Sequence, residues 1–391
     1  MNKKKLFTIF LSLSLALPGF AGCGKGEADA QGTPTIADNA GEDESKGNAD
    51  HEKDTAGSGE AGEDAADGGG DDAAEENTPD IQITHIRDLS NPNATEKTKL
   101  VYDYLCSVTG QGIISGVEES VGAQNSNAEI QYIKKVSDKY PALRGFDFIN
   151  DDFDGVVKRA SFWGNDMKGL VTISWHWGTP PDGIGYESSK GSVDMDELLT
   201  EGSELYNAMI VQMDTAAEAL KELQEAGVVV LWRPFHEFDG QWFWWGKGGS
   251  EKFITLWKLM YDRYTNHHGL NNLIWVLGYS SQVKRDWYPG DAYVDICGAD
   301  SYANGTRKAL YKLVSGYAAQ GMPIPLHECD NIPDPDKLQE EGTNWTWFMT
   351  WTLSYLKEKN TKESLNAIFN HDYVITLDEL PDFNALMEGT E

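Results

Sequence analysis

The sequence predicts an α/β protein whose folded part is a single (β/α)8 barrel. Short apolar runs recur along residues 81–391, and charged stretches of helical character lie between several of them. Continuous apolar strands that alternate with amphipathic helices are typical of a parallel sheet covered by helices. About 310 residues are available in this region, which suits eight strand-helix units closed into a barrel.

The eight predicted strands are, in order, 112–115, 142–148, 170–177, 228–233, 272–277, 294–298, 323–328 and 347–351. Each contains β-branched, aromatic or other apolar residues in a short run, as strands buried on both faces do. Helices are predicted between them, most clearly over 214–226 (DTAAEALKELQEA) and 251–266. An open doubly wound sheet is the rival fold, but no strand is followed by GxGxxG or GxxxxGK[ST].

Polar residues stand where most of these strands end. They are Asp147, His176, His236, Glu237, Asp300, Tyr302 and Glu328. In a barrel of parallel strands the carboxyl ends share one rim, which is where catalytic groups converge. The sequence therefore predicts one pocket at that rim.

The N-terminus reads as an export signal. Lys3 to Lys5 are followed by the apolar run Leu6 to Leu17, which is too short to span a bilayer. The residues FAGC at 20–23 resemble a bacterial lipobox, in which Cys23 would become the acylated N-terminus. We expect residues 1–22 to be a lipoprotein signal peptide and the protein to be exported and anchored by lipid at the cell envelope or surface. The alternative is an ordinary cleaved signal in which Cys23 has no role.

Residues 23–80 are predicted to be a disordered acidic tether, and residues 81–391 the single (β/α)8 domain. Positions 24–80 carry 18 acidic and three basic side chains, a net charge of −15 out of −31 for the chain. Such a segment buries too little apolar surface to offset its ordering entropy. The acidic balance of the whole chain makes nucleic acid an unexpected partner, and we expect a monomer.

Cysteine spacing indicates no metal site. Apart from Cys23, the chain has Cys106, Cys297 and Cys329, an odd number without a CxxC pair. We expect three thiols, no metal and no organic cofactor. His236 and Glu237 lie in HEFDG, which lacks the second histidine of the HExxH zinc motif.

Two carboxylates suit glycoside hydrolysis. Glu237 follows the fourth strand and Glu328 ends the seventh, so the two face each other across the barrel mouth. Cleavage of a glycosidic bond needs one carboxyl group to protonate the leaving oxygen and another to attack or to activate water. The tryptophans of WFWWG at 242–246 supply rings on which the apolar faces of a pyranose can pack.

The folded part resembles glycoside hydrolase family 26, a group of retaining (β/α)8 barrels known chiefly as endo-β-1,4-mannanases. The matching stretches are YPALRGFDF (140–148), VTISWHW (171–177), WRPFHEFDGQWFWWG (232–246), WYPGDAYVDICGADSY (287–302), PIPLHE (323–328), WTWFMTW (345–351) and YVITLDELP (373–381). Together they extend from about residue 112 to 381.

This resemblance implies Glu237 as general acid/base and Glu328 as nucleophile. It implies that the residues orienting the carboxylates and the sugar are His176, Arg233, His236 and Tyr302, with Asp300 close by. Trp242 and Trp351 would stack on the sugar, although Trp347 could take the place of Trp351. Of Trp244 and Trp245, we expect Trp245 to be the one at the site.

Two stretches depart from the family pattern. Cys329-Asp330-Asn331 follows the predicted nucleophile, and Ser115-Gly116-Val117-Glu118 replaces a loop that usually contains histidine.

The expected function is that of an exported endo-β-1,4-mannanase acting on mannan, galactomannan or glucomannan with retention. The alternatives are a β-glucanase or β-xylanase of the same family, and a surface lipoprotein that binds glycans without cleaving them.

Overall fold

A closed parallel barrel forms the centre of the structure. The computed structural model describes residues 81–121 and 126–388. Within these residues nine strands form one sheet in the order β2-β3-β4-β5-β6-β7-β8-β1-β9, and β1 also pairs with β2. That pairing closes β1 to β8 into a barrel in which all neighbours are parallel. The prediction of a (β/α)8 barrel is confirmed.

Each predicted strand overlaps one strand of the barrel. The strands are β1 (Ile113–Glu118), β2 (Leu143–Asp147), β3 (Leu170–Ser174), β4 (Val230–Arg233), β5 (Leu273–Tyr279), β6 (Ile296–Asp300), β7 (Leu326–Cys329), β8 (Trp347–Thr350) and β9 (Val374–Ile375). The short β9 pairs with β1 and lies outside the closed ring.

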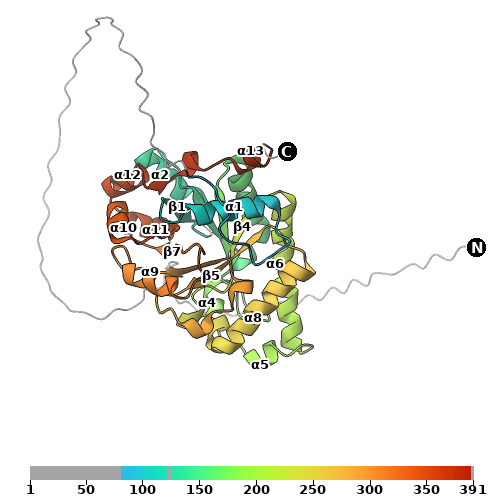
Figure 1. The fold of residues 1–391 in the computed structure, drawn as a ribbon. Coiled ribbons are helices and arrows are strands. Elements are labelled where there is room, and N and C mark those ends of the chain that lie inside the picture. Colours follow the sequence, from blue (N-terminus) through green and yellow to red (C-terminus); the bar gives the residue numbers. More distant parts are fainter. Residues whose placement is uncertain (1–80, 122–125, 389–391) are drawn as a thin grey trace, which may run out of the picture. The chain divides into compact units, whose positions relative to one another are not determined.

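Helices surround the strands (Figure 1). They are α1 (Glu96–Val108), α2 (Ala128–Ser137), α3 (Phe153–Ser161), α4 (Gly185–Ser189), α5 (Met195–Leu198), α6 (Glu204–Glu225), α7 (Trp244–Lys247), α8 (Ser250–Asp262), α9 (Lys308–Ser315), α10 (Pro335–Glu341), α11 (Leu353–Lys359), α12 (Lys362–Phe369) and α13 (Phe383–Glu388). Short 3-10 or π turns supplement them, including η3 (Phe238–Gly240) beside the predicted site.

Helix α6 begins ten residues before the predicted start. The hydroxyl of Ser203 accepts a hydrogen bond from the N–H of Tyr206 at 2.9 Å and caps the helix there. Met209 and Met213 are fully buried and extend the apolar face of α6 toward its N-terminus. The second predicted helix, 251–266, is α8 followed by a π turn at 263–267.

Two groups of buried residues fill the fold. The barrel interior holds Ile114, Leu143, Leu170, Leu231, Ile274, Ile296, Trp347 and Met349, together with residues of α1. A larger group lies between the strands and the outer helices. Helix α1 covers the N-terminal end of the barrel, where the hydroxyl of Tyr102 donates to the carbonyl of Asp295 at 2.8 Å. Beyond the other end, where the strands have their carboxyl ends, Glu237, Trp242 and Trp351 are partly exposed.

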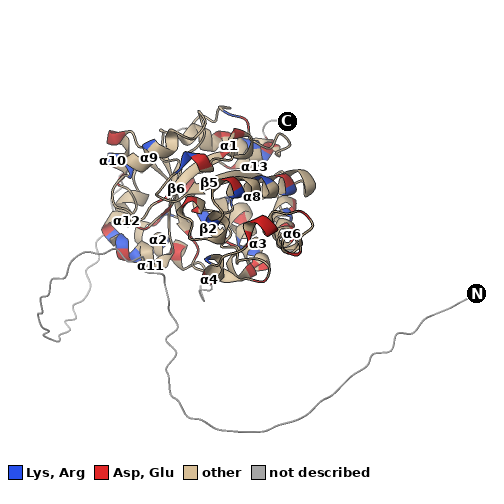
Figure 2. Ribbon diagram, turned by 90° about the horizontal axis from the view of Figure 1, so that it is seen from below, with Lys and Arg blue, Asp and Glu red and all other residues tan. Residues whose placement is uncertain are grey.

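The cysteine prediction is confirmed for the described residues, since Cys106, Cys297 and Cys329 are free and buried. Basic and acidic residues are interspersed over the helices in the view of Figure 2. Among the described helices, none is long and apolar enough to cross a membrane. The predicted signal peptide, tether and Cys23 lie outside the described residues.

Candidate active site

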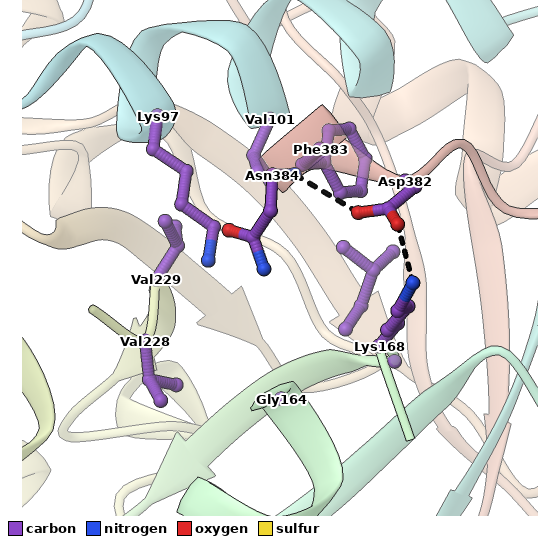
Figure 3. Close-up of a pocket in the computed structure, with 11 residues that line it drawn as sticks. Lys97, Val101, Gly164, Lys168, Val228, Val229, Asp382, Phe383 and Asn384 are labelled. Atoms are coloured by element: carbon purple, nitrogen blue, oxygen red, sulfur yellow. Dashed lines mark hydrogen bonds and ion pairs between the residues drawn. The ribbon is translucent and has the colours of Figure 1, made fainter. Parts of the chain in front are cut away.

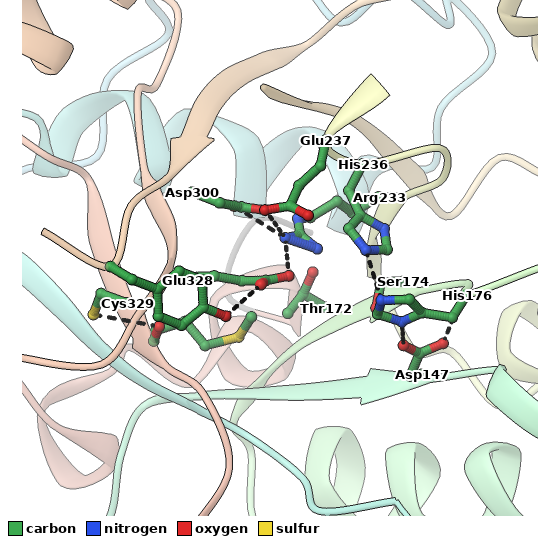
Figure 4. A network of polar contacts seen from close by, with 12 residues as sticks. Asp147, Thr172, Ser174, His176, Arg233, His236, Glu237, Asp300, Glu328 and Cys329 are labelled. Atoms are coloured by element: carbon green, nitrogen blue, oxygen red, sulfur yellow. Dashed lines mark hydrogen bonds and ion pairs between the residues drawn. The ribbon is translucent and has the colours of Figure 1, made fainter. Parts of the chain in front are cut away.

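The predicted polar residues of the site lie close together at the carboxyl ends of the strands, and most of them are labelled in Figure 4. Arg233, Asp300 and Glu328 come from β4, β6 and β7, while His176 follows β3 and His236 and Glu237 follow β4. The pairing of β6 with β7 shifts register between Ala299 and Asp300, which sets Asp300 beside Glu328. The prediction of one shared rim therefore agrees with the structure.

Glu237 stands in a strained turn just beyond β4. Its φ is +54°, as is that of Phe235, and this left-handed conformation costs a residue with a side chain roughly 1–2 kcal/mol. The N–H of Glu237 donates to the carbonyl of Gly278 on β5 at 2.8 Å. Its Oε2 accepts from the indole N–H of Trp242 at 2.9 Å. The chain therefore leaves the strand abruptly and holds this carboxyl group at the mouth of the barrel.

The loop that carries Glu237 is anchored from behind. Asp239 is fully buried and accepts from the N–H of Ser280, after β5, at 2.8 Å. The indole N–H of Trp245 donates to the carbonyl of His236 at 2.9 Å. Hydrogen bonds on both sides of Glu237 thus offset the strain of the turn.

Glu328 is held by two donors. One amino group of Arg233 donates to Oε1 of Glu328 and also to both oxygens of Asp300, at 3.0 and 2.9 Å. The hydroxyl of Tyr302 donates to Oε2 of Glu328 at 2.9 Å. Arg233, Asp300 and Glu328 are all at least 95% buried, so these charge-assisted bonds are poorly screened by water.

The two glutamates are close neighbours. Glu237, Asp300 and Glu328 each have a carboxylate oxygen within 4.8 Å of the others. Burial, and then the negative charge of Glu328, raise the pKa of Glu237 to about 8, although Arg233 and Trp242 act in the opposite direction. One carboxyl group can therefore hold a proton at neutral pH beside another that accepts hydrogen bonds from Arg233 and Tyr302.

These three oxygens are also close enough together to bind a cation. The guanidinium group of Arg233 already places a positive charge on Asp300 and Glu328. Arg233 therefore already balances negative charge on two of these three carboxylates.

A chain of polar contacts links β2 to the loop after β4. Asp147 forms an ion pair with Nδ1 of His176 and also accepts from its backbone N–H at 2.9 Å. Nε2 of His176 lies 3.0 Å from Nε2 of His236. Burial alone would lower the pKa of His176, but Asp147 outweighs it and raises the pKa. Burial, followed by the charges of His176 and Arg233, lowers the pKa of His236 well below its usual range. His176 is accordingly the donor and neutral His236 the acceptor.

Burial distinguishes the tryptophans that could stack on a sugar from those that could not. Trp242 and Trp351 are half-buried, and the ring of Trp351 lies 6.1 Å from that of His176. Trp347 is buried in the barrel interior beside His327, with ring centroids 5.4 Å apart. Trp351, and not Trp347, therefore has the open ring.

Trp245 differs from expectation. Its ring is fully buried and stacks on Phe243, with centroids 4.5 Å apart. A side chain without exposed surface offers no face to a sugar. Trp245 instead supports the backbone of His236 and packs behind the site, and Trp244 is equally buried.

Two acidic residues near the site had no role in the sequence prediction. Asp147 was noted only as a strand-end residue, and its position one strand before His176 was the available signal. Glu118 is 98% buried at the end of β1. It lies in one of the two stretches that depart from the family pattern.

The opposite end of the barrel has a small cavity (Figure 3). Lys97, Lys168, Val229, Asp382 and Asn384 are among its lining residues. Its cavity volume of about 30 Å³ has room for one or two water molecules. It is thus too small to bind a sugar.

The chain is similar to known proteins in sequence and in fold. A model of glycosyl hydrolase family 26 matches residues 90–379. A mannan endo-1,4-beta-mannosidase of Thermothelomyces thermophilus is 34% identical over 323 residues, which are 77% of this chain and 64% of that protein. The chain therefore spans less than two thirds of that relative.

Solved structures of mannanases share the fold of this chain. The GH26-CBM35 beta-(1,4)-mannanase of Podospora anserina is 36% identical, with a TM-score of 0.69, over 76% of this chain and 69% of the other. A beta-mannanase from a symbiotic protist of the termite Reticulitermes speratus, solved with gluco-manno-oligosaccharide, is 30% identical. Its TM-score is 0.70, over 75% of this chain and 98% of the other.

Proposed function

Because the chain belongs to glycosyl hydrolase family 26, we propose that it is an endo-β-1,4-mannanase that retains anomeric configuration. The observation that carries this proposal is the approach of Glu237 and Glu328 within 4.8 Å at the open end of the barrel. Retaining glycosidases hold their two carboxyl groups about 5 Å apart, whereas inverting enzymes leave about 6.5–9.5 Å for a water molecule. The spacing supports direct attack by one carboxylate.

In the first step Glu328 attacks the anomeric carbon as Glu237 gives its proton to the leaving oxygen. The C–O bond to the leaving sugar breaks while a C–O bond to Glu328 forms. Arg233 and Tyr302 each donate to a different oxygen of Glu328, which orients the attacking group. A pKa of about 8 keeps the proton on Glu237 at neutral pH.

In the second step water replaces the enzyme ester. Once Glu328 is esterified its negative charge is gone, and the largest electrostatic contribution that raised the pKa of Glu237 disappears with it. Glu237, now ionised, takes a proton from the water that attacks the anomeric carbon. The C–O bond to Glu328 then breaks and both groups return to their starting states.

Mannan is the favoured substrate because the relatives reported above are named as mannanases. Trp242 and Trp351 offer half-buried rings on which a sugar could pack, and His176 lies near Trp351 as a charged donor. Arg233 and Tyr302 both donate to Glu328, and Trp242 donates to Glu237. These contacts argue against a protein that binds glycans without cleaving them.

A substrate panel tests the activity. Mannan, galactomannan, glucomannan, barley β-glucan and xylan are incubated with the full chain, and product sizes are measured. Release of short oligosaccharides from the mannans is expected. Preferred cleavage of β-glucan or xylan would reassign the substrate, and binding without any cleavage would refute the enzyme.

Variants test the mechanism in the same assay. Glu328→Gln and Glu237→Gln are each expected to lower turnover by several orders of magnitude. An activated aryl glycoside, whose leaving group needs no acid, should still be cleaved in its first step by Glu237→Gln but not by Glu328→Gln. NMR of the earliest product should show the β-anomer, and an α-anomer would exclude the retaining mechanism.

We also propose that the enzyme is exported and anchored through acylated Cys23. The support is the N-terminal sequence alone. Cys23→Ser is expected to move the protein from the membrane fraction to the soluble fraction, whereas Ser58→Ala should leave it in place. Retention of the Cys23→Ser protein in the membrane would refute the anchor.

A further inference from the structure

Glu118 is a third carboxyl group inside the barrel that the reaction steps do not use. It ends β1, where its register partner on β2 is Gly145. A Cβ at Gly145 would collide with Oε2 of Glu118 and come within 2.7 Å of Sδ of Met349. The Glu118 side chain thus lies against β2 in the space where any residue other than glycine at position 145 would place its Cβ. It points into the barrel interior.

The surroundings of Glu118 do not suit an ionised carboxylate. The residue is 2% exposed, and its Oε1 is buried without a hydrogen-bond partner among the described residues. Leaving an ionised oxygen buried and unpaired is costly, so such groups keep their proton.

The charged groups near Glu118 have the same effect. Asp147 on β2 and Glu328 on β7 are acidic, and Arg233 on β4 is the cation that acts on Glu118. Burial, followed by Asp147 and Glu328, raises the pKa of Glu118 well above its usual range despite Arg233.

The remaining titratable neighbours of Glu118 form ion pairs or hydrogen bonds with other residues. Glu119 is ion-paired with Arg144 of β2 and with Arg159, and Glu129 of α2 accepts from Ser120 and from the N–H of Leu353. Strands β8 and β9 carry no titratable side chain.

Arg233 connects Glu118 to the reaction. After Asp300 and Glu328, Glu118 is the next acid that acts on this guanidinium group. Nε and Nη1 of Arg233 are buried and have no hydrogen-bond partner among the described residues, while Nη2 serves Asp300 and Glu328. An ionised Glu118 would offer these idle donors a competing anion.

We propose that Glu118 is a positioning residue that must be protonated for turnover, because its ionised form would draw Arg233 away from Glu328. When Glu118 is neutral, Arg233 interacts with Asp300 and with the proposed nucleophile Glu328 alone. This inference rests on the proposed function for its kinetic consequence, but the protonation of Glu118 can be measured without catalysis.

The kinetic test compares the wild type with Glu118→Gln, which has the shape of the neutral acid and cannot ionise. Near pH 6 the two should have kcat/KM values within about threefold of each other. At alkaline pH the wild type should lose activity more steeply than one proton explains, because Glu118 ionises as well as Glu237. In Glu118→Gln the fall of kcat/KM at alkaline pH should follow the loss of one proton. The same pH dependence in the two proteins would overturn the proposal.

The equilibrium test measures unfolding by denaturant between about pH 5 and pH 8. A carboxyl group whose pKa is raised in the folded state holds a proton that the unfolded chain releases, so stability falls with rising pH over this range. Glu118→Gln should lower by one the number of protons released on unfolding, and so make the fall of stability with pH less steep. The exposed control Glu96→Gln should leave it unchanged.

The outcomes separate the two proposals. A changed unfolding slope with an unchanged rate limb would show that Glu118 holds a proton but does not position Arg233, which overturns the inference. An unchanged unfolding slope would show that Glu118 ionises normally, which also overturns it. Failure to cleave any glycan would refute the proposed function, yet the unfolding slope would still report on Glu118. If Glu118→Gln does not fold, Glu118→Met serves in both measurements.

Discussion

The indole N–H of Trp242 donates to Oε2 of Glu237 at 2.9 Å. The residues are five positions apart, joined by the short turn η3 and by Gln241, which also has a positive φ. The same residue that presents a half-buried ring to the open site thus orients the carboxyl group proposed as acid/base.

Removing this hydrogen bond is expected to change the pH dependence. Trp242→Phe keeps a ring but loses the N–H, which stabilises the ionised form of Glu237. The pKa of Glu237 should rise above about 8, and a bond to a charged group worth about 1.5 kcal/mol corresponds to a shift of roughly one pH unit. The alkaline limb of kcat/KM should move upward by that amount. Trp351→Phe is the control, and a limb that moves to lower pH would contradict the role of Trp242.

The Tyr302 hydroxyl is expected to contribute to catalysis and little to stability. Tyr302 is 38% exposed and donates to Glu328 at 2.9 Å. Loss of a hydrogen bond to a charged group costs about 1.5–3 kcal/mol, so Tyr302→Phe should lower kcat about 10- to 100-fold with little change in Tm. The neighbouring Tyr355, whose ring lies 5.7 Å away, supplies the control Tyr355→Phe. Equal effects of both variants would show that the hydroxyl contact is unimportant.

The pair of Asp147 and His176 is expected to make stability depend on pH. Burial alone would raise the pKa of Asp147, but His176 lowers it, while Asp147 raises that of His176. The contribution of Asp147 is lost as pH falls through its lowered pKa, and that of His176 is lost as pH rises through its raised pKa. Both are therefore fully present between about pH 4 and pH 6.5.

Asp147→Asn tests this pair by urea unfolding. Breaking a buried ion pair costs about 3 kcal/mol, so the variant should lose about that much near pH 6 and clearly less near pH 9, where His176 is closer to neutral. Asp152→Asn is the control, because the carboxylate of Asp152 pairs with Arg159 and is 51% exposed. A loss for Asp147→Asn that is the same at both pH values would exclude a charged His176.

Trp245 and Trp351 are expected to respond in opposite ways to truncation. Trp245→Ala removes a fully buried ring and should cost about 3–5 kcal/mol of unfolding free energy. Trp351→Ala removes a half-buried ring at the mouth and should raise KM for mannan about tenfold, equivalent to about 1.4 kcal/mol of binding. Calorimetry and steady-state kinetics on both variants check this. A stable Trp245→Ala protein with raised KM would restore Trp245 to the sugar site.

The eight barrel strands and the grouping of polar residues at one rim were predictable from the sequence. Both follow from local pattern, because a strand buried on both faces must be apolar along its length and parallel strands end on the same side. Glu237 and Glu328 could be chosen for the same reason, as each comes at the end of such a run. The predicted start of α6 was ten residues too late, and the N-cap residue Ser203 marks the true beginning.

Tertiary structure alone decided which side chains reach the open site. Trp245 and Trp351 both follow strands and look alike in sequence, yet packing behind His236 buries the first and leaves the second half-exposed. The role of Glu118 depends on the closure of β1 against β2, where Gly145 leaves it space. Its electrostatic interaction with Arg233 depends on the barrel placing β1 and β4 around one interior. Local sequence determines which strands form, whereas the charge and exposure of a side chain depend on neighbours that only closure of the barrel brings together.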